Sequence, residues 1–145
     1  MLVVPMLRLD ADLAAPTYAR PGDAGADLSA RVDVTVAPGG GRALVPTGVC
    51  VAIPEGYAGF VLPRSGLALR HGVTLANSPG LIDCGYREEV QVVLLNTDPA
   101  TPFEVRRGDR IAQLVIQKVE EATFAAVEEL PPTAGRSGGF GHTGR

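Results

Sequence analysis

Hydrophobic positions along this chain fall into short runs rich in β-branched residues, and turn-forming residues separate the runs. The runs cover residues 32–36, 44–45, 49–53, 60–62, 90–95 and 111–116. The 18 Gly and 12 Pro are spread throughout the chain, so regular secondary structure is interrupted every several residues. Many short strands separated by turns predict an all-β sandwich or barrel.

One short helix is predicted at residues 65–71, with the sequence SGLALRH. Ser65 is expected to cap its start, and Gly72 is expected to end it, because these residue types suit the two ends of a helix. The sequence contains no internal repeat and no recognisable linker. We therefore expect one domain over residues 1–130.

The segment 131–145 has a different composition. It is rich in Pro, Gly and Ser, and Phe140 is its single aromatic residue. Such a segment cannot bury enough apolar surface to order on its own. We expect either a loose end or an arm that becomes ordered on a ligand.

Composition narrows the class of protein. The 145 residues suit one domain, and 46% of them are hydrophobic, with no Trp and 5% aromatics, so the core should consist mostly of Val, Leu, Ile and Ala. A net charge of −3 argues against a general nucleic-acid binder. No stretch has the length of a membrane span or the pattern of a signal peptide, so a cytoplasmic protein is expected. Cys50 and Cys84 are expected to be reduced thiols.

The segment 77–87, NSPGLIDCGYR, carries the first candidate chemistry. Asp83 ends a short apolar run between turn residues, and Tyr86 follows three positions later. A carboxylate on a hairpin is a candidate general base, because a rigid scaffold holds it while one side stays open to a ligand.

Two further stretches suit phosphate. Arg64 and Ser65 lie where a strand gives way to the helix, and a helix start offers backbone N–H groups to an anion. A plain helix start with a surface Arg is an equal alternative. In the stretch 108–113, Arg110 and Gln113 are three residues apart, so an ideal strand would point them to opposite faces unless a bulge intervenes. Alone, this stretch favours a turn followed by an edge strand.

Two Gly-rich stretches complete the set. Asp27 lies in the stretch 22–28, and its carboxylate could hold a water of hydrated Mg²⁺, although a solvated acidic turn is the simpler interpretation. In the stretch 135–144, glycines allow close approach to phosphates, Arg136 and Thr143 supply charge and a hydroxyl, and Phe140 could stack on a base. A flexible solubilising end is the alternative. No zinc site is predicted, because His and Cys lack ligand spacing.

Taken together and in order, these stretches resemble the trimeric deoxyuridine triphosphatases (dUTPases). The matching pieces are AGADLSA at 24–30, PRSGLA at 63–68, NSPGLIDCGYR at 77–87, GDRIAQ at 108–113 and RSGGFGHTG at 136–144. The resemblance implies a jelly-roll-like β-barrel that assembles as a homotrimer, with active sites built by motifs from different subunits. It also implies hydrolysis of dUTP to dUMP and pyrophosphate with Mg²⁺.

The resemblance also implies a role for each site residue. Asp83 would activate water for attack on the α-phosphorus, Asp27 would hold Mg²⁺ through water, and Tyr86 would pack on the deoxyribose. Asn77 and the backbone of Gly80, Leu81 and Ile82 would read the uracil edge. The remaining residues would bind substrate, mostly through the triphosphate, with Phe140 on the uracil face: Arg64, Ser65, Gly66, Arg110, Gln113, Arg136, Phe140, Gly141, His142 and Thr143.

The chain departs from the family pattern at two positions. Glu88 replaces a Gly in the common run Tyr-Arg-Gly-Glu, and it is expected to face solvent; if positive φ were needed there, the hairpin would be strained. His142 replaces a common Ser. Three alternatives remain open: a dCTP deaminase-like enzyme, a non-catalytic dUTP-binding regulator, and a structural jelly-roll module without a ligand.

Overall fold

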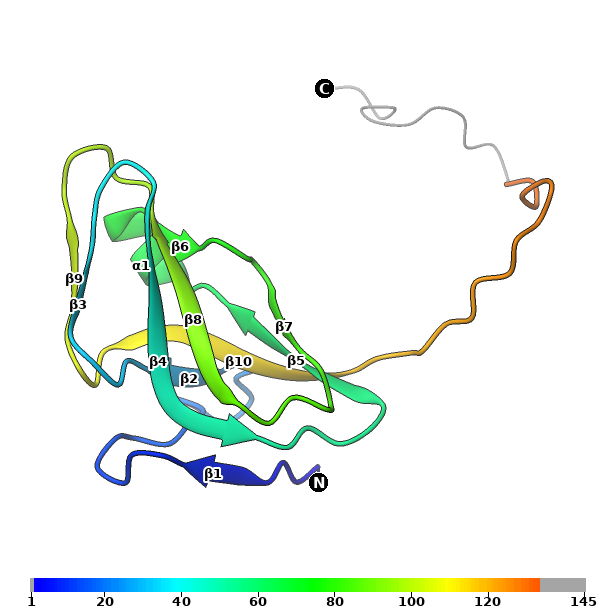
Figure 1. Ribbon diagram of the computed structural model, residues 1–145, viewed down its shortest axis with the longest axis horizontal. Coiled ribbons are helices and arrows are strands. Elements are labelled where there is room, and N and C mark those ends of the chain that lie inside the picture. Colours follow the sequence, from blue (N-terminus) through cyan, green and yellow to red (C-terminus); the bar gives the residue numbers. More distant parts are fainter. Residues whose placement is uncertain (1, 134–145) are drawn as a thin grey trace.

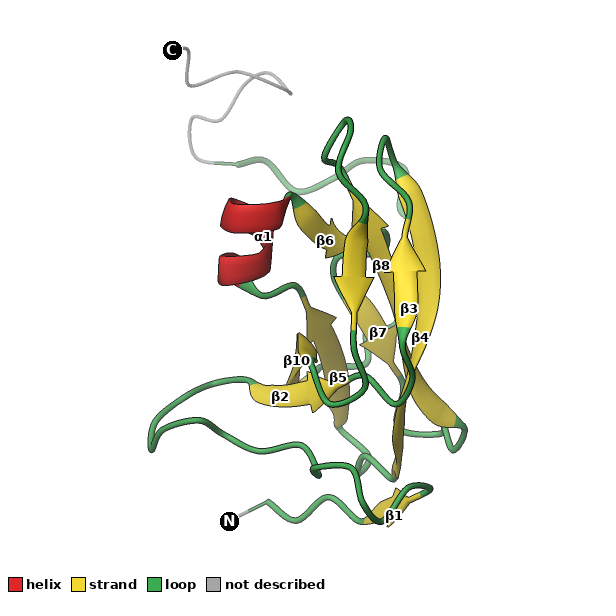
Figure 2. Cartoon of the chain, turned by 90° about the vertical axis from the view of Figure 1, so that its left-hand side faces the viewer, coloured by secondary structure: helices red, strands yellow, loops and turns green. Residues whose placement is uncertain are grey.

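The computed structural model describes residues 2–133, and its fold is built from two four-stranded antiparallel sheets (Figure 1). The first sheet has the order β1 (Met6–Arg8), β4 (Gly41–Val51), β8 (Glu89–Asn96) and β6 (Val73–Leu75). The second has the order β2 (Ala26–Ser29), β10 (Arg110–Lys118), β5 (Tyr57–Leu62) and β7 (Gly80–Ile82). Strands β3 (Val34–Val36) and β9 (Phe103–Val105) form a separate pair beside them (Figure 2). The expected all-β, jelly-roll-like barrel with one short helix is confirmed.

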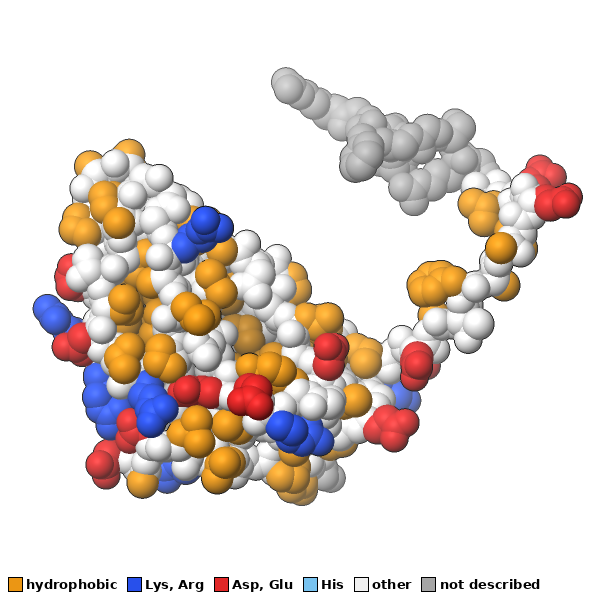
Figure 3. Space-filling view, viewed as in Figure 1, with side chains coloured by type: hydrophobic (Ala, Val, Ile, Leu, Met, Phe, Trp, Pro, Cys, Tyr) orange, Lys and Arg blue, Asp and Glu red, His pale blue; other side chains and the backbone are white. Residues whose placement is uncertain are grey.

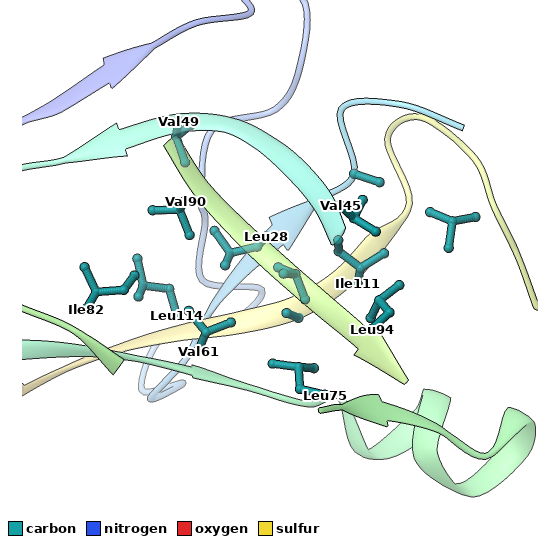
Figure 4. Packing of buried hydrophobic residues seen from close by; sticks show 14 of the residues in the cluster. Leu28, Val45, Val49, Val61, Leu75, Ile82, Val90, Leu94, Ile111 and Leu114 are labelled. Carbon is teal, nitrogen blue, oxygen red and sulfur yellow. The ribbon is translucent and has the colours of Figure 1, made fainter. Parts of the chain in front are cut away.

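The core lies between the two large sheets and is entirely aliphatic. In β8, Val90, Val92 and Leu94 are buried and alternate with more exposed neighbours, as the period of a strand requires. Residues from β2, β5 and β10 meet them from the opposite sheet (Figure 4). Every residue of this buried cluster is Val, Leu, Ile or Ala, which confirms the core composition expected from the sequence.

Strand β4 joins two runs that the sequence analysis treated as separate. Its pairing with β8 shifts register between Pro46, which faces Gln91, and Cys50, which faces Glu89. Gly48 lies inside this bulge with φ of 75°, a conformation that glycine adopts without strain. The bulge lets one long strand continue through Pro and Gly residues that interrupt the sequence pattern.

The helix α1 (Ser65–His71) has the predicted bounds, but the predicted cap at Ser65 is wrong. The N-cap residue is Arg64, whose backbone is extended, and no side-chain hydrogen bond caps the helix. The guanidinium of Arg64 instead contacts Asp27 and the carbonyl oxygen of Arg110. Gly72 ends the helix in the left-handed conformation, as predicted.

The chain leaves the barrel after β10, and residues 119–133 contain neither strand nor helix (Figure 1). These residues are exposed to solvent. The predicted arm of residues 131–145 lies mostly outside the described residues, so the boundary at residue 130 stays a prediction. Across residues 2–133, no helix has the length and apolar character needed to cross a membrane. Cys50 and Cys84 are free thiols, as expected.

Candidate active site

Four side chains predicted for substrate or metal meet in what we call the Asp27 cluster: Asp27, Arg64, Arg110 and Gln113. Asp27 is 7% exposed, and its carboxylate accepts hydrogen bonds from Arg110 and Gln113 and forms an ion pair with Arg64. Its Oδ1 lies 3.4 Å from Nε of Arg64 and 3.4 Å from Nε2 of Gln113, and its Oδ2 lies 3.1 Å from Nη1 of Arg110. In the sequence these residues belong to separate motifs, and in the folded chain they contact one another.

Strand register explains how β10 delivers two side chains to one carboxylate. Gln113 lies opposite Asp27 on β2. The ladder shifts register between Arg110 and Ala112, so β10 has the bulge that the three-residue spacing required. Arg110 therefore reaches the same carboxylate as Gln113. On the other side of β10, Arg64 follows the end of β5 and donates from Nη1 to the Arg110 carbonyl oxygen at 2.8 Å.

The charges of the Asp27 cluster favour an anion on its outer side. One buried carboxylate faces two guanidinium groups, so the cluster keeps one net positive charge. The Arg64 and Arg110 side chains are 26% and 55% exposed, so part of each planar donor fork reaches solvent. Such forks match phosphate oxygens in geometry and charge.

The start of α1 adds to this positive region. Ser65 and Gly66 are its first two residues, directly after Arg64. A Cβ atom placed on Gly66 would lie 2.8 Å from Nη2 of Arg70, so the Arg70 guanidinium lies over the helix start. Arg70 was not among the residues predicted from the sequence. The spacing of four residues from a glycine to an arginine on one helix was the available signal.

The segment 77–87 forms the wall of a pocket of about 150 Å³. Asn77, Gly80 and Tyr86 line it, together with Leu81, Ile82 and residues 90–93 of β8. The Asn77 amide approaches Gly80 so closely that a Cβ atom there would lie 3.2 Å from Nδ2. The pocket thus combines backbone polar groups, one amide and an aromatic ring, which suits a small planar ligand with polar edges.

Asp83 and Tyr86 belong to the turn that follows β7. The backbone N–H of Tyr86 donates to the Asp83 carbonyl oxygen at 3.1 Å, and the Tyr86 hydroxyl donates to the Glu89 carbonyl oxygen at 2.8 Å. The Asp83 side chain is exposed, so water can reach its carboxylate. Glu88 is exposed as expected, and no non-glycine residue among those described has positive φ, so the hairpin is not strained there.

Asp83 and the Asp27 cluster lie at opposite ends of β5. Ile82 pairs with Gly59, so the chain carries Asp83 to the beginning of β5, where Asp83 and Ala58 line one surface hollow. Arg64 lies beyond the other end. Arg64 lies six positions after Ala58 along extended chain, which spans about 20 Å. This distance is too long for both groups of one chain to act on the same phosphate.

The remaining predicted residues, Arg136, Phe140, Gly141, His142 and Thr143, lie outside the described residues. Within residues 2–133, no group of three or more His, Cys, Asp or Glu side chains is arranged to hold a metal ion. The Asp27 carboxylate already accepts hydrogen bonds from Arg110 and Gln113 and pairs with Arg64, and a carboxylate has about four lone-pair sites, so it retains room for a water. It fits an outer-sphere contact to hydrated Mg²⁺ but not a direct metal cage.

Comparison with known proteins connects this geometry to a family. The family model described as dUTPase matches residues 11–144. The deoxyuridine 5'-triphosphate nucleotidohydrolase of Thermobifida fusca (strain YX) is 61% identical over 141 residues, which cover 97% of this chain and 78% of that protein. The protein of the same name from Streptomyces coelicolor is 57% identical over 143 residues, covering 99% and 78%.

Solved structures agree on the fold. A variant of the Staphylococcus bacteriophage 80alpha dUTPase, solved with dUpNHpp, superimposes with a TM-score of 0.90 at 24% identity and covers all of both chains. A variant dUTPase from phage phi11 of S. aureus gives a TM-score of 0.82 at 24% identity, covering 90% of this chain and all of that one. The match over residues 11–144 and the identity to curated relatives place the chain in the dUTPase family.

Proposed function

We propose that this protein hydrolyses dUTP to dUMP and pyrophosphate, at sites that each combine parts of more than one copy of the chain. One observation carries the proposal. In a chain of the dUTPase family, the segment 77–87 walls a small polar-edged pocket, and its Asp83 carboxylate, directly after the pocket-lining Ile82, is open to water.

Asp83 is the general base in this proposal. Its carboxylate accepts a proton from water as the water oxygen attacks the α-phosphorus in line with the leaving pyrophosphate. The turn hydrogen bond from Tyr86 to the Asp83 carbonyl oxygen holds the backbone of this residue while its side chain stays accessible.

The pocket selects the nucleoside. Asn77 and the backbone of residues 80–82 read the uracil edge, and cytosine is rejected because its amino group would leave buried polar groups unpaired. Tyr86 packs on the deoxyribose and leaves no space for a 2′-hydroxyl. Its hydrogen bond to the Glu89 carbonyl oxygen supports this role, because it fixes the ring.

The Asp27 cluster and the start of α1 bind the triphosphate. Arg64, Ser65, Gly66 and Gln113 contact phosphate oxygens, and Arg110 supports them through Asp27. The described part of the chain leaves these donors on one partly exposed surface. From the segment after residue 133, Arg136, Gly141, His142 and Thr143 contribute further phosphate contacts, and Phe140 covers the uracil face.

Mg²⁺ would neutralise the charge that develops on the phosphate oxygens during transfer. Asp27 would hold it through a water, since its carboxylate has room for one further hydrogen bond. Because the described residues provide no metal cage, most of the inner ligands would be oxygens of water and of the triphosphate.

A homotrimer supplies what one chain lacks. The separation of about 20 Å along β5 prevents Asp83 and Arg64 of one chain from sharing a site. In a closed ring, Asp83 of one chain can approach the Asp27 cluster of the next, and the same contact repeats around the ring. Light scattering at working concentration tests this assembly, and a fully active monomer would contradict it.

The deciding assay is pyrophosphate release from dUTP, dCTP, dTTP and UTP by the wild type and Asp83→Asn. We expect release from dUTP in clear preference, and a loss of about 10²–10⁴-fold in the variant, with nucleotide binding retained. Ammonia release from dCTP would instead indicate a deaminase. Tight dUTP binding without pyrophosphate release would indicate a non-catalytic regulator.

A further inference from the structure

Glu89 occupies a junction that none of the proposed substrate contacts explains. It is the first residue of β8, two positions after the segment 77–87 ends. Its side chain is 17% exposed. Its Oε1 accepts the backbone N–H of Gly48 at 2.7 Å and lies 3.5 Å from Nη1 of Arg31. A carboxylate therefore ties the start of β8 to the bulge of β4.

The bulge needs this carboxylate because its own ladder is interrupted. Three residues of β4, Thr47 to Val49, stand against Val90 alone. The Thr47 hydroxyl compensates by donating to the Val90 carbonyl oxygen at 2.6 Å, and the Glu89 carboxylate takes the Gly48 N–H. A backbone N–H left without an acceptor in such a position costs free energy.

Arg31 extends the support to the outer loops. Its Nε lies 3.6 Å from Asp10, and Asp10 also binds Nη1 of Arg107 at 2.6 Å. Figure 3 shows acidic and basic side chains gathered in the lower left of the molecule, near the end of β9. Glu89 is thus fixed from β4 and from a charged network on the surface.

The backbone of the same residue holds Tyr86. The Tyr86 hydroxyl donates to the Glu89 carbonyl oxygen at 2.8 Å, and the Tyr86 ring lines the pocket. The side chain and the carbonyl group of one residue therefore connect the β4 bulge to the aromatic wall of the pocket.

We propose that Glu89 is a positioning residue for Tyr86. The Glu89 carbonyl oxygen fixes the Tyr86 ring by accepting from its hydroxyl, and the fixed ring sets the discrimination between dUTP and UTP. This rests on the proposed function for its kinetic readout. Without the carboxylate, residue 89 loses its attachment to Gly48 and Arg31, the anchor of the hydroxyl shifts, and the ring closes less tightly over the sugar.

The test is a double-mutant cycle with Glu89→Ala and Tyr86→Phe, read as the ratio of kcat/KM for UTP to that for dUTP. Each single change should raise the ratio, by about tenfold for Glu89→Ala, and the double variant should gain less than about twofold over Tyr86→Phe. Glu88→Ala is the matched control, because it truncates an exposed neighbouring glutamate, and it should leave the ratio unchanged. Glu89→Gln keeps an oxygen for the Gly48 N–H and should recover most of the wild-type ratio.

The inference would be overturned if the two changes raised the ratio independently, so that their effects multiplied in the double variant. An unchanged ratio in folded Glu89→Ala would overturn it as well. Should Glu89→Ala fail to fold, Arg31→Gln enters the same cycle, and its expected coupling to Tyr86→Phe has the same sign. Spectra of ¹³C-labelled tyrosine, of which the chain has three, provide a readout without turnover. The Tyr86 ring signals should shift in Glu89→Ala and not in Glu88→Ala, and unshifted signals would refute the positioning role even in a protein that hydrolyses no dUTP.

Discussion

Mixing two inactive variants should restore activity, because β5 holds Asp83 and Arg64 of one chain about 20 Å apart. Asp83→Asn removes the proposed base and should cost about 10²–10⁴-fold. Arg64→Ala removes a guanidinium that pairs with Asp27 and faces the proposed phosphate site, and it should cost about 10²–10³-fold. Neither change touches the aliphatic core, so both variants should fold and assemble.

The size of the recovery follows from the geometry. A complete site takes Asp83 from one chain and Arg64 from a neighbour. In a random mixture of equal amounts, each requirement is met with a chance of one half, so about a quarter of the sites in a cyclic trimer should be intact. A site contained within one chain would never be complete in the mixture, and activity would stay near the background of the parents.

In the assay, the two variants are unfolded together in urea and refolded. Pyrophosphate release from dUTP is then compared with that of wild type treated identically. Variants refolded separately and combined afterwards serve as the control. Native mass spectrometry confirms that mixed assemblies have formed. A mixture of proven mixed assemblies that stays as inactive as its parents would refute the division of the site between chains.

Three further predictions concern the tail and stability. Deletion of the residues after Pro132 should preserve the melting temperature and sharply lower kcat/KM for dUTP; equal turnover would remove residues 136–143 from the site. Leu94→Ala, at a fully buried position, should lower the free energy of unfolding by about 2–5 kcal/mol in urea titrations. The pKa of Asp10 is lowered by its hydrogen bond with Arg107, and that of Asp98 by backbone N–H groups of Ala100 and Thr101. Their contribution to stability should be complete above the ordinary carboxyl pKa of about 4 and decline as pH falls through the lowered values, so Asp10→Asn should flatten the acid limb of melting temperature against pH.

The longer strands could be predicted because their alternation is local. β8 buries every second residue along its length, and this pattern is readable without a partner, whereas β10 was recognisable as a long β-branched run. β6, β7 and β9 have three residues each, too few for a period to appear. The sequence also did not predict that β4 is one continuous strand, because Gly48 interrupts the pattern. The bulge at Gly48 depends on the neighbouring strand β8 and on the Glu89 carboxylate that accepts its N–H.

The residues of the site could be predicted more readily than the contacts between them. Asp27, Arg64 and Gln113 stood out as motif members, yet their shared contact depends on β2, β5 and β10 lying side by side. The wrong cap at Ser65 has the same origin. The N-cap position is occupied by Arg64, whose side chain pairs with Asp27, 37 residues earlier (64 − 27). A capping rule considers only adjacent sequence and cannot anticipate this contact.

With each site divided between chains as proposed, the bound nucleotide becomes part of the quaternary structure. In the proposed trimer, a substrate that fills one site contacts two chains, so its binding free energy is shared with the subunit interface. Nucleotide at a hundred times its Kd would add about 2.7 kcal/mol for each occupied site to the stability of the assembly. Dissociation on dilution should therefore occur at lower protein concentration when a non-hydrolysable dUTP analogue is present, which makes the substrate a regulator of the oligomer that acts on it.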